Sequence, residues 1–325
     1  MNIFMKSGRR KKLGILFVVM ACIIGAGTLY WQLQYKSGLS LASESLDLIV
    51  DPPTFEKFEK FEAAKPQAGV MNVLLLGSDA HKDENGRSDT LMIAHYNQTT
   101  NDMKLVSIMR DTYVEIPDNG KQKKNAAFAF GGPELVRKTI KQNFDIDVQY
   151  YATVNFTGFS KIMDVIAPDG IEVEVPYPIP YGAGKIEPGK QVLNGDQLLG
   201  YVRFRSDDQN DFGRVERQQE VLSKVKDQAI SIHTLLNVPK LLGLTEPYID
   251  TNINKQTLLK VGKGLLPGKS DMQTLRIPIA NSYKDERVAV GAVLSIDLEK
   301  NKQALQQFLS PEDEIGSVKV VGNGN

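Results

Sequence analysis

The stretch MNVLLLGSDAHKDENGRSDTLMIAHY, residues 71–96, contains two runs of apolar residues separated by a polar loop. The first run, residues 71–77, ends at a glycine, and the second covers residues 90–96. Both runs, and a third at residues 103–109, are rich in the residue types that form buried strands. These runs predict that an α/β domain begins near residue 71.

Helical patterns lie between and after further predicted strands. Residues 132–144, 157–166 and 213–230 place apolar side chains at helical spacing. Residues 171–175 alternate between apolar and acidic side chains, as a half-exposed strand does, and the tail from about residue 270 predicts one more strand and a closing helix. Strands mixed with helices predict a layered α/β fold with helices on both faces of the sheet.

The residues before this domain predict a membrane anchor. Residues 1–12 carry five Lys and Arg side chains, and the run from Leu13 to Trp31 has no charged residue. As a helix this run is about 28 Å long, close to the thickness of a hydrocarbon core. We therefore predict a cytoplasmic basic tail (1–12), a transmembrane signal-anchor helix (13–35), an extracellular stalk (36–70) and an extracellular domain (71–325). The alternative is a cleaved signal peptide, although the run is longer than is usual there.

The predicted stalk contains one further pattern. Phe55, Phe58 and Phe61 recur at three-residue spacing between charged residues, and prolines flank the segment. This pattern predicts a short amphipathic helix on the surface of the stalk, with a partner-binding helix as the alternative.

Composition limits the possible classes of function. The chain has 39 basic and 39 acidic side chains, and this zero net charge argues against a nucleic-acid binder held by long-range attraction. The only cysteine, Cys22, lies within the predicted span, so the outer domain has no internal disulfide. None of the three histidines has the spacing of a metal site or of a catalytic triad.

Two aspartates are predicted at one end of the sheet. Asp79 follows the first predicted strand, and Asp89 opens the second. Strand ends and their loops form ligand sites in open α/β sheets, so the two carboxylates are expected to lie near each other. Carboxylates suit Mg²⁺ or Mn²⁺, which takes its remaining ligands from water and phosphate oxygens. The alternative is that each is an ordinary turn or cap residue.

The stretch YVRFRSDDQNDFGRVERQ, residues 201–218, holds four of the chain's 11 arginines and no lysine. The four arginines are Arg203, Arg205, Arg214 and Arg217, and the candidate site also includes the polar side chain of Gln218. If residues 201–205 are extended and a helix begins near Gly213, two pairs of guanidinium groups converge. Guanidinium groups bind phosphate oxygens through paired hydrogen bonds, and a helix N-terminus also favours anions. The pattern therefore predicts a phosphate site, with an ion-pair network among the nearby acids as an equally weighted alternative.

Five motifs occur in the order and approximate spacing of the LytR-CpsA-Psr family of Gram-positive bacteria. They are GSDAHKDENGRSDT, SIMRDTYVEIP, NAAFAFGG, VNFTGF and YVRFRSDDQNDFGRVERQ, and they lie between residues 71 and 230. Several separated motifs are more specific than one, and the chain resembles this family. The resemblance implies an extracellular α-β-α sandwich with a central mixed sheet, anchored by one N-terminal helix. It also implies a bound polyprenyl (pyro)phosphate whose tail lies in a hydrophobic tunnel, expected near residues 155–166 and 220–225.

The implied reaction moves a phosphate-linked anionic glycopolymer, such as wall teichoic acid or a capsule-like glycan, from its polyprenyl pyrophosphate carrier to a peptidoglycan sugar hydroxyl. Asp79 and Asp89 match the family's Mg²⁺-associated aspartates, and Arg87 and Arg110 match its pyrophosphate-binding arginines. The arginine-rich stretch above matches the segment around the same pyrophosphate. The expected catalytic residues are Asp89, Arg87, Arg110, Arg203 and Arg217, with Asp89 as the acceptor of the hydroxyl proton even though a metal-bound aspartate is a weak base.

The sequence departs from the family pattern at two points. Met109 stands where a proline is more common, and Asn125-Ala126-Ala127 stands where Asn-His-Ala is more common. Two other functions use the same site. A non-catalytic polyprenyl-phosphate-binding envelope regulator or attenuator binds the lipid without turnover, and a lipid pyrophosphatase uses water as the acceptor.

Overall fold

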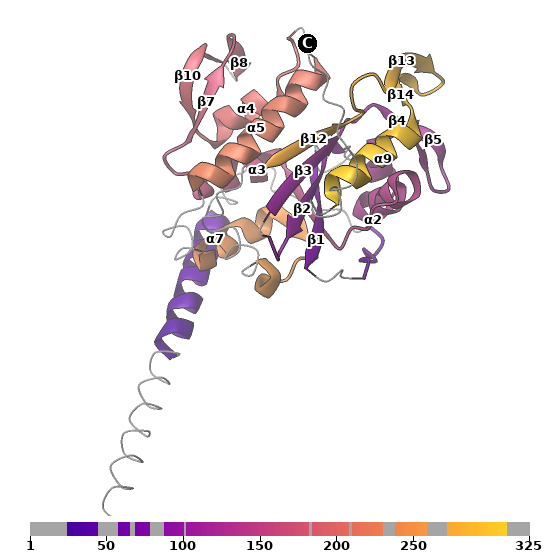
Figure 1. Cartoon of the computed structure of the whole chain (residues 1–325). Coiled ribbons are helices and arrows are strands. Elements are labelled where there is room, and N and C mark those ends of the chain that lie inside the picture. The colour runs from indigo at the N-terminus through magenta and orange to yellow at the C-terminus, as the bar shows by residue number, and fades with distance from the viewer. Residues whose placement is uncertain are drawn as a thin grey trace, which may run out of the picture.

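The computed structural model describes residues 25–44, 58–65, 69–78, 88–100, 102–181, 184–207, 210–229, 238–258 and 272–310. Its centre is a six-stranded mixed sheet with the strand order β11-β6-β1-β2-β3-β12 (Figure 1). The strands are β1 (Val70–Ser78), β2 (Ser88–Asn97), β3 (Asp102–Ile108), β6 (Tyr150–Asn155), β11 (Ile249–Thr251) and β12 (Gln273–Ile277). β1 is antiparallel to β2 and parallel to β6, so the predicted mixed α/β class is confirmed.

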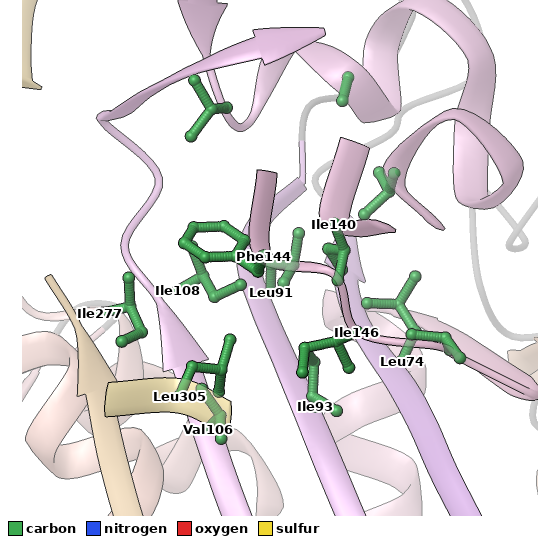
Figure 2. Packing of buried hydrophobic residues seen from close by; sticks show 14 of the residues in the cluster. Leu74, Leu91, Ile93, Val106, Ile108, Ile140, Phe144, Ile146, Ile277 and Leu305 are labelled. Carbon is green, nitrogen blue, oxygen red and sulfur yellow. The ribbon is translucent and has the colours of Figure 1, made fainter. Parts of the chain in front are cut away.

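Helices cover both faces of this sheet. One face carries α2 (Ala126–Phe144) and α9 (Leu298–Leu309), and the other carries α3 (Phe156–Ile166), α4 (Gly195–Arg203) and α5 (Asp211–Ala229) (Figure 1). Phe144 of α2 and Leu305 of α9 pack with Ile93 and Val106 of the sheet in the first core (Figure 2). The layered arrangement predicted from the alternation of strands and helices is therefore present.

Residues paired across neighbouring strands alternate between the two faces. Leu74 pairs with Ile93, and both are fully buried in the first core. The next pair, Leu75 and Met92, lines a cavity on the opposite face, beneath α3, α4 and α5. A slip of one residue would exchange these faces, so the register of β1 against β2 decides which side chains enter the first core and which line the cavity.

Smaller elements surround the main sheet. A second sheet, in the order β13-β14-β4-β5, contains β4 (Thr112–Ile116), β5 (Gly120–Lys123), β13 (Tyr283–Val288) and β14 (Gly291–Ile296). Two strand pairs consist of β7 (Ile171–Val175) with β10 (Gly189–Leu193) and β8 (Ile179–Tyr181) with β9 (Gly184–Ile186). The remaining helical elements are residues 25–44, α7 (Val238–Thr245) and η1 (Glu246–Tyr248).

The segment around Arg203 is helical, whereas one interpretation of the sequence had it extended. α4 begins at a capping box in which the Asn194 side chain accepts from Gln197 N–H, and Leu198 and Tyr201 are buried one turn apart. The chain becomes extended only at Phe204. Arg203 and Arg205 therefore do not share the face of one strand.

α2 begins earlier than the predicted helix at 132–144. Its first turns precede a kink at Gly131 and Gly132, after which Pro133 starts the straight part. Gly132 has a φ of 59°, and a Cβ there would lie 2.2 Å from Cγ of Phe58. Only glycine fits this conformation and this contact.

The predicted amphipathic helix in the stalk is wrong for its described part. Residues 58–65 are not helical, and their N–H groups bond to the domain: Glu62 N–H donates to Glu134 Oε2 at 2.9 Å and Ala64 N–H to the Val148 carbonyl at 3.1 Å. The ring centres of Phe58 and Phe128 lie 5.5 Å apart. The aromatic side chains of this segment thus belong to the first core, because the domain supplies both their packing and their backbone partners.

The N-terminal prediction falls largely outside the described residues, which begin within the predicted span at residue 25. Residues 25–44 form a helix beside α7 (Figure 1), so helical structure continues past the predicted end of the span at residue 35. Ala42 is fully buried in the second core, and Lys255 Nζ donates to the Tyr35 hydroxyl at 2.7 Å. Within the described part of the chain, none of the helices combines the length and apolar character of a membrane span.

Candidate functional site

Asp89 lies at the start of β2, where three arginines from distant segments surround its carboxylate. Arg110 Nη1 lies 3.3 Å from Asp89 Oδ1, and Arg205 donates to Oδ2. Arg214 approaches from α5, with Nη2 3.2 Å from the Asp89 carbonyl and Nη1 3.6 Å from Oδ2. The structure therefore brings together four of the residues predicted for this site.

The charge of Asp89 depends on these arginines. Burial alone would raise the pKa of Asp89, but the hydrogen bonds and positive charges of Arg205 and Arg110 outweigh it and hold this pKa below its ordinary value. Asp89 is consequently ionised at neutral pH. An ionised carboxylate is the form that binds a metal ion, and it is a weak proton acceptor.

Asp211, at the first residue of α5, was not singled out in the sequence as a site residue. Its Oδ1 lies 2.8 Å from Arg214 Nη2, 3.7 Å from Arg205 Nε and 4.0 Å from Arg110 Nε. Burial raises the pKa of Asp211, and the nearby charges of Asp111 and Asp89 act in the same direction against the arginines. The available signal was its position three residues before Arg214, which places both side chains on one side of a helix.

Arg203 differs from Arg205 and Arg214, which contact carboxylates, because it stacks on an aromatic ring. Its guanidinium carbon lies 3.9 Å from the centre of the Phe156 ring. Across the described ranges, no carboxylate lies within ion-pair distance of Arg203. A stacked guanidinium keeps its edge available for an anion.

A polar cavity of about 400 Å³ contains most of these groups. Its lining residues are Asp89, Thr90, Phe156, Arg203, Phe204, Arg205, Ser206, Arg214 and Gln218. Gln218 Nε2 donates to Thr90 Oγ1 at 3.0 Å, which attaches α5 to the start of β2. The cavity has three arginines on its wall and one ionised carboxylate, so it is suited to a multiply charged anion.

Arg217 is not among the residues that line this cavity. It is 6% exposed, and its Nη1 lies 2.6 Å from Asp207 Oδ2 and 2.9 Å from the Tyr177 hydroxyl. Its Nε and Nη2 donate to the carbonyls of Tyr201 and Phe204. All three guanidinium nitrogens are therefore bonded to protein groups that hold the loop carrying Arg205.

An apolar cavity of about 230 Å³ adjoins the polar one. The two share Thr90, Phe156, Arg203 and Gln218. Among the other lining residues are Phe159, Ile162 and Met163 of α3, Leu199 and Val202 of α4, and Val221 and Leu222 of α5. The segments predicted to line a tunnel, 155–166 and 220–225, both contribute to this cavity. A charged pocket next to an apolar one fits an amphiphile with an anionic head.

Some predicted residues lie outside the described part of the chain. These are Asp79 and Arg87, together with His81 and His233. Ser78 pairs with Ser88, which places the end of β1 beside the start of β2 and Asp89. The residues that the structure describes contain no group of three or more His, Cys, Asp or Glu side chains arranged to hold a metal ion.

The remaining histidine has a structural role. His95 is 5% exposed, and its Nδ1 lies 2.8 Å from Asn72 Oδ1. Burial and the positive charge of Lys104 lower the pKa of His95 to about 4. His95 is therefore neutral at physiological pH.

A third cavity, of about 620 Å³, lies against Asp211. Its acidic lining residues are Asp111, Asp211, Glu216, Asp285 and Glu286, and Arg276 also contributes. Asp211 contacts Arg205 and Arg214 of the polar cavity and also lines this third cavity. Asp211 therefore lies between the polar cavity and the third cavity.

Comparison with known proteins identifies relatives over most of the chain. Residues 50–307 match the LytR_cpsA_psr family. "Regulatory protein MsrR" of Staphylococcus aureus is 37% identical over 281 residues, which cover 86% of this chain and 84% of that protein. "Polyisoprenyl-teichoic acid–peptidoglycan teichoic acid transferase TagU" of Enterococcus faecalis is 32% identical over 254 residues, 76% of this chain and 80% of that protein.

Solved structures share the fold. Bacillus subtilis TagV superimposes with a TM-score of 0.65 at 27% identity, over 76% of this chain and 100% of that one. A structure described as TagT bound to LIIa-WTA gives a TM-score of 0.61 at 27% identity, over 80% and 99% of the two chains. The family match spans more than half of the sequence, and the five motifs and the fold agree with it. The chain belongs to the LytR_cpsA_psr family.

Proposed function

We propose that this protein transfers a phosphate-linked anionic glycopolymer, of the teichoic acid or capsule-like kind, from a polyprenyl pyrophosphate carrier to a sugar hydroxyl of peptidoglycan. The observation that carries the proposal is that two cavities lie next to each other: one is lined by Arg203, Arg205 and Arg214, the other is apolar, and they share four lining residues. A pyrophosphate fits the first and a prenyl tail fits the second. The name of the Enterococcus faecalis relative supports this substrate class.

The proposed reaction is a phosphoryl transfer in which the acceptor oxygen bonds to phosphorus and the bridging P–O bond breaks. Polyprenyl phosphate leaves, and negative charge develops on its oxygen. Arg203 and Arg205 line the cavity where this charge would form, and preorganised guanidinium groups stabilise it. The carboxylate of Asp211 is a stronger base than that of Asp89, because the pKa of Asp211 is raised while that of Asp89 is lowered, and Asp211 contacts Arg205 and Arg214 of the polar cavity.

We propose that Asp89 is one ligand of the Mg²⁺ or Mn²⁺ expected from the sequence. The Asp89 carboxylate is ionised and borders the polar cavity, which is where a ligand to a phosphate-bound ion must lie. Asp79 and Asp89 would hold the ion, which when bound neutralises charge on phosphate oxygens. The proposed setting is the outer face of a Gram-positive cell membrane, with the first twelve residues in the cytoplasm, on the sequence evidence of the basic cluster before the apolar run.

The test is a transfer assay with a short-chain lipid-pyrophosphate glycan and a peptidoglycan oligomer. We expect glycan attached to the oligomer and lipid monophosphate released in equal amounts, and no transfer after chelation by EDTA. Release of free phosphorylated glycan with the oligomer present would identify a lipid pyrophosphatase instead. Tight binding of the lipid without either product would identify a regulator that binds the lipid, a possibility that the name of the Staphylococcus aureus relative keeps open.

Arg203→Lys tests whether the guanidinium group binds phosphate oxygens through two parallel hydrogen bonds. Lysine keeps the charge but loses the planar fork and the stack on Phe156, so we expect transfer to fall at least about ten-fold. The melting temperature should change little, because the Arg203 side chain is exposed, makes no described ion pair and loses only its stack on Phe156. Arg287→Lys, on the exposed strand β13, is the matched control. Equal activity of the two variants would exclude bidentate binding by Arg203.

A further inference from the structure

Lys124 is a buried cation that the proposed mechanism does not use. It lies in the turn between β5 and α2 and is 2% exposed, and no group in the described part of the chain hydrogen-bonds to its Nζ. The adjacent Lys123 has a side chain that is 26% exposed, and its Nζ lies 2.8 Å from Asp111 Oδ1. Buried lysines are rare and are normally paired, so an unpaired one next to a paired one requires a physical reason.

The backbone fixes Lys124 in its buried position. Its N–H donates to the Thr112 carbonyl at 2.8 Å, and its carbonyl accepts from Ala127 N–H at 3.1 Å, in the first turn of α2. The positive end of that helix faces the turn, and its first turn contains no acidic residue. The side chain therefore has no local anion to neutralise it.

The charges that act on Lys124 belong to the candidate site. They are Asp89 from β2, Asp211 from α5, and Asp111 and Arg110 from the turn between β3 and β4. Across the described residues, none of these carboxylates lies within ion-pair distance of Lys124 Nζ. Three carboxylates of the site thus act on Lys124 through space, and Asp89 also lines the polar cavity.

These carboxylates raise the pKa of Lys124 by less than burial lowers it. Burial lowers the pKa of Lys124 to about 7, while Asp89, Asp211 and Asp111 act in the opposite direction. A lysine with such a pKa is present in both charged and neutral forms near neutral pH. An anion in the polar cavity, which Asp89 lines, acts on Lys124 in the same sense as the carboxylates and favours the charged form.

We propose that Lys124 is a proton-linked cation of the polar cavity: it takes up a proton when a pyrophosphate group binds, and supplies a positive charge only while that group is present. This inference rests on the proposed function in one respect, namely that the cavity holds a pyrophosphate. An ammonium fixed at this buried position would destabilise the empty protein, whereas a neutral amine does so much less. The proton adds attraction for the ligand without a permanent buried charge.

The experiment is calorimetric titration of the protein with geranyl diphosphate at pH 8, without metal, in two buffers that differ in ionisation enthalpy. The probe is fully ionised at this pH and releases no proton of its own. We expect the wild-type protein to take up close to one proton per ligand, and Lys124→Met to take up almost none. Lys123→Met, the neighbouring lysine that is already paired with Asp111, should keep the wild-type proton uptake.

The affinity gives a second measure of the same linkage. Uptake of one proton requires the wild-type Kd to rise about ten-fold per pH unit above pH 7, because binding then competes with loss of that proton. The Kd of Lys124→Met should change little over the same range. Equal proton uptake by the wild type and Lys124→Met, or wild-type binding with no uptake, would overturn the role of Lys124 and leave the phosphate site standing. Failure of the wild type to bind the probe would overturn both.

Thermal unfolding of the ligand-free proteins checks that Lys124→Met folds. The folded pKa of Lys124, about 7, lies below the ordinary value of 10.5, so between these pH values the unfolded chain binds more protons than the native one. The contribution of Lys124 to the free energy of unfolding therefore becomes more favourable as pH rises through this window, and it is least favourable below pH 7. Lys124→Met should be more stable than the wild type, with a larger difference at pH 7 than at pH 9. A variant that gains stability and loses proton uptake matches the proposal, whereas a loss of stability would show that Lys124 serves only the fold.

Discussion

Asp89→Asn should reduce transfer by on the order of 10²- to 10⁴-fold, the range associated with loss of a proton-transfer or charge-organising group. The carboxylate contacts Arg110, Arg205 and Arg214, and asparagine leaves these guanidinium groups without their shared anion. It also removes the one described ligand of the proposed metal ion. Steady-state transfer from the lipid-pyrophosphate glycan measures the loss of activity. Calorimetric titration with Mg²⁺ in the presence of geranyl diphosphate measures metal binding directly.

The fold should survive this change. Arg214 is 2% exposed, and it keeps its contact with Asp211 at 2.8 Å when Asp89 loses its charge. Asp118→Asn is the matched control, because Asp118 is exposed and has a φ of 61°, a conformation that asparagine adopts readily. Transfer by Asp89→Asn within about three-fold of this control would mean that neither the metal nor the arginine cluster depends on the carboxylate.

The elements that position the site follow patterns that can be read along the chain. The apolar runs of β1 and β2 and the helical spacing of α5 predict the layers, because periodic burial determines both. Local pattern and tertiary packing agree in these regions. The apolar cavity was expected from the family resemblance and not from the local pattern, because the apolar side chains of residues 155–166 and 220–225 have the same signature as core residues.

Spacing alone did not predict which arginines line the polar cavity and which bind protein groups. Arg203 and Arg217 have the same side chain in the same motif, but only Arg203 lines the cavity, because Asp207 of that motif and Tyr177 from an earlier segment bind Arg217. Lys124 presents a similar difficulty. A lysine in a run of polar residues predicts a solvated turn, and its burial follows from how β5 and α2 pack, which no sequence period reports.

Arg217→Met should lower the free energy of unfolding by about 3–5 kcal/mol, because it leaves a buried carboxylate without its partner. The Asp207 side chain is 4% exposed and its Oδ2 lies 2.6 Å from Arg217 Nη1. Burial would raise the pKa of Asp207, but hydrogen bonds from Tyr177 and Arg217 hold it below the ordinary value. Arg217→Lys should also destabilise, since one ammonium cannot replace bonds made by three nitrogens. Thermal and urea unfolding should show a melting temperature lower by roughly 10 °C or more.

The double variant Arg217→Met with Asp207→Asn separates the buried charge from the lost geometry. Removing both charges should recover part of the stability lost in Arg217→Met, because no uncompensated carboxylate is left. Transfer should not recover with it, since the carbonyls of Tyr201 and Phe204 still lack the donors that hold the loop of Arg205. If Arg217→Met instead keeps wild-type stability and loses only transfer, then Arg217 turns toward the phosphate when substrate binds, as the motif alone predicts. In that case its contacts in the free protein do not stabilise the fold.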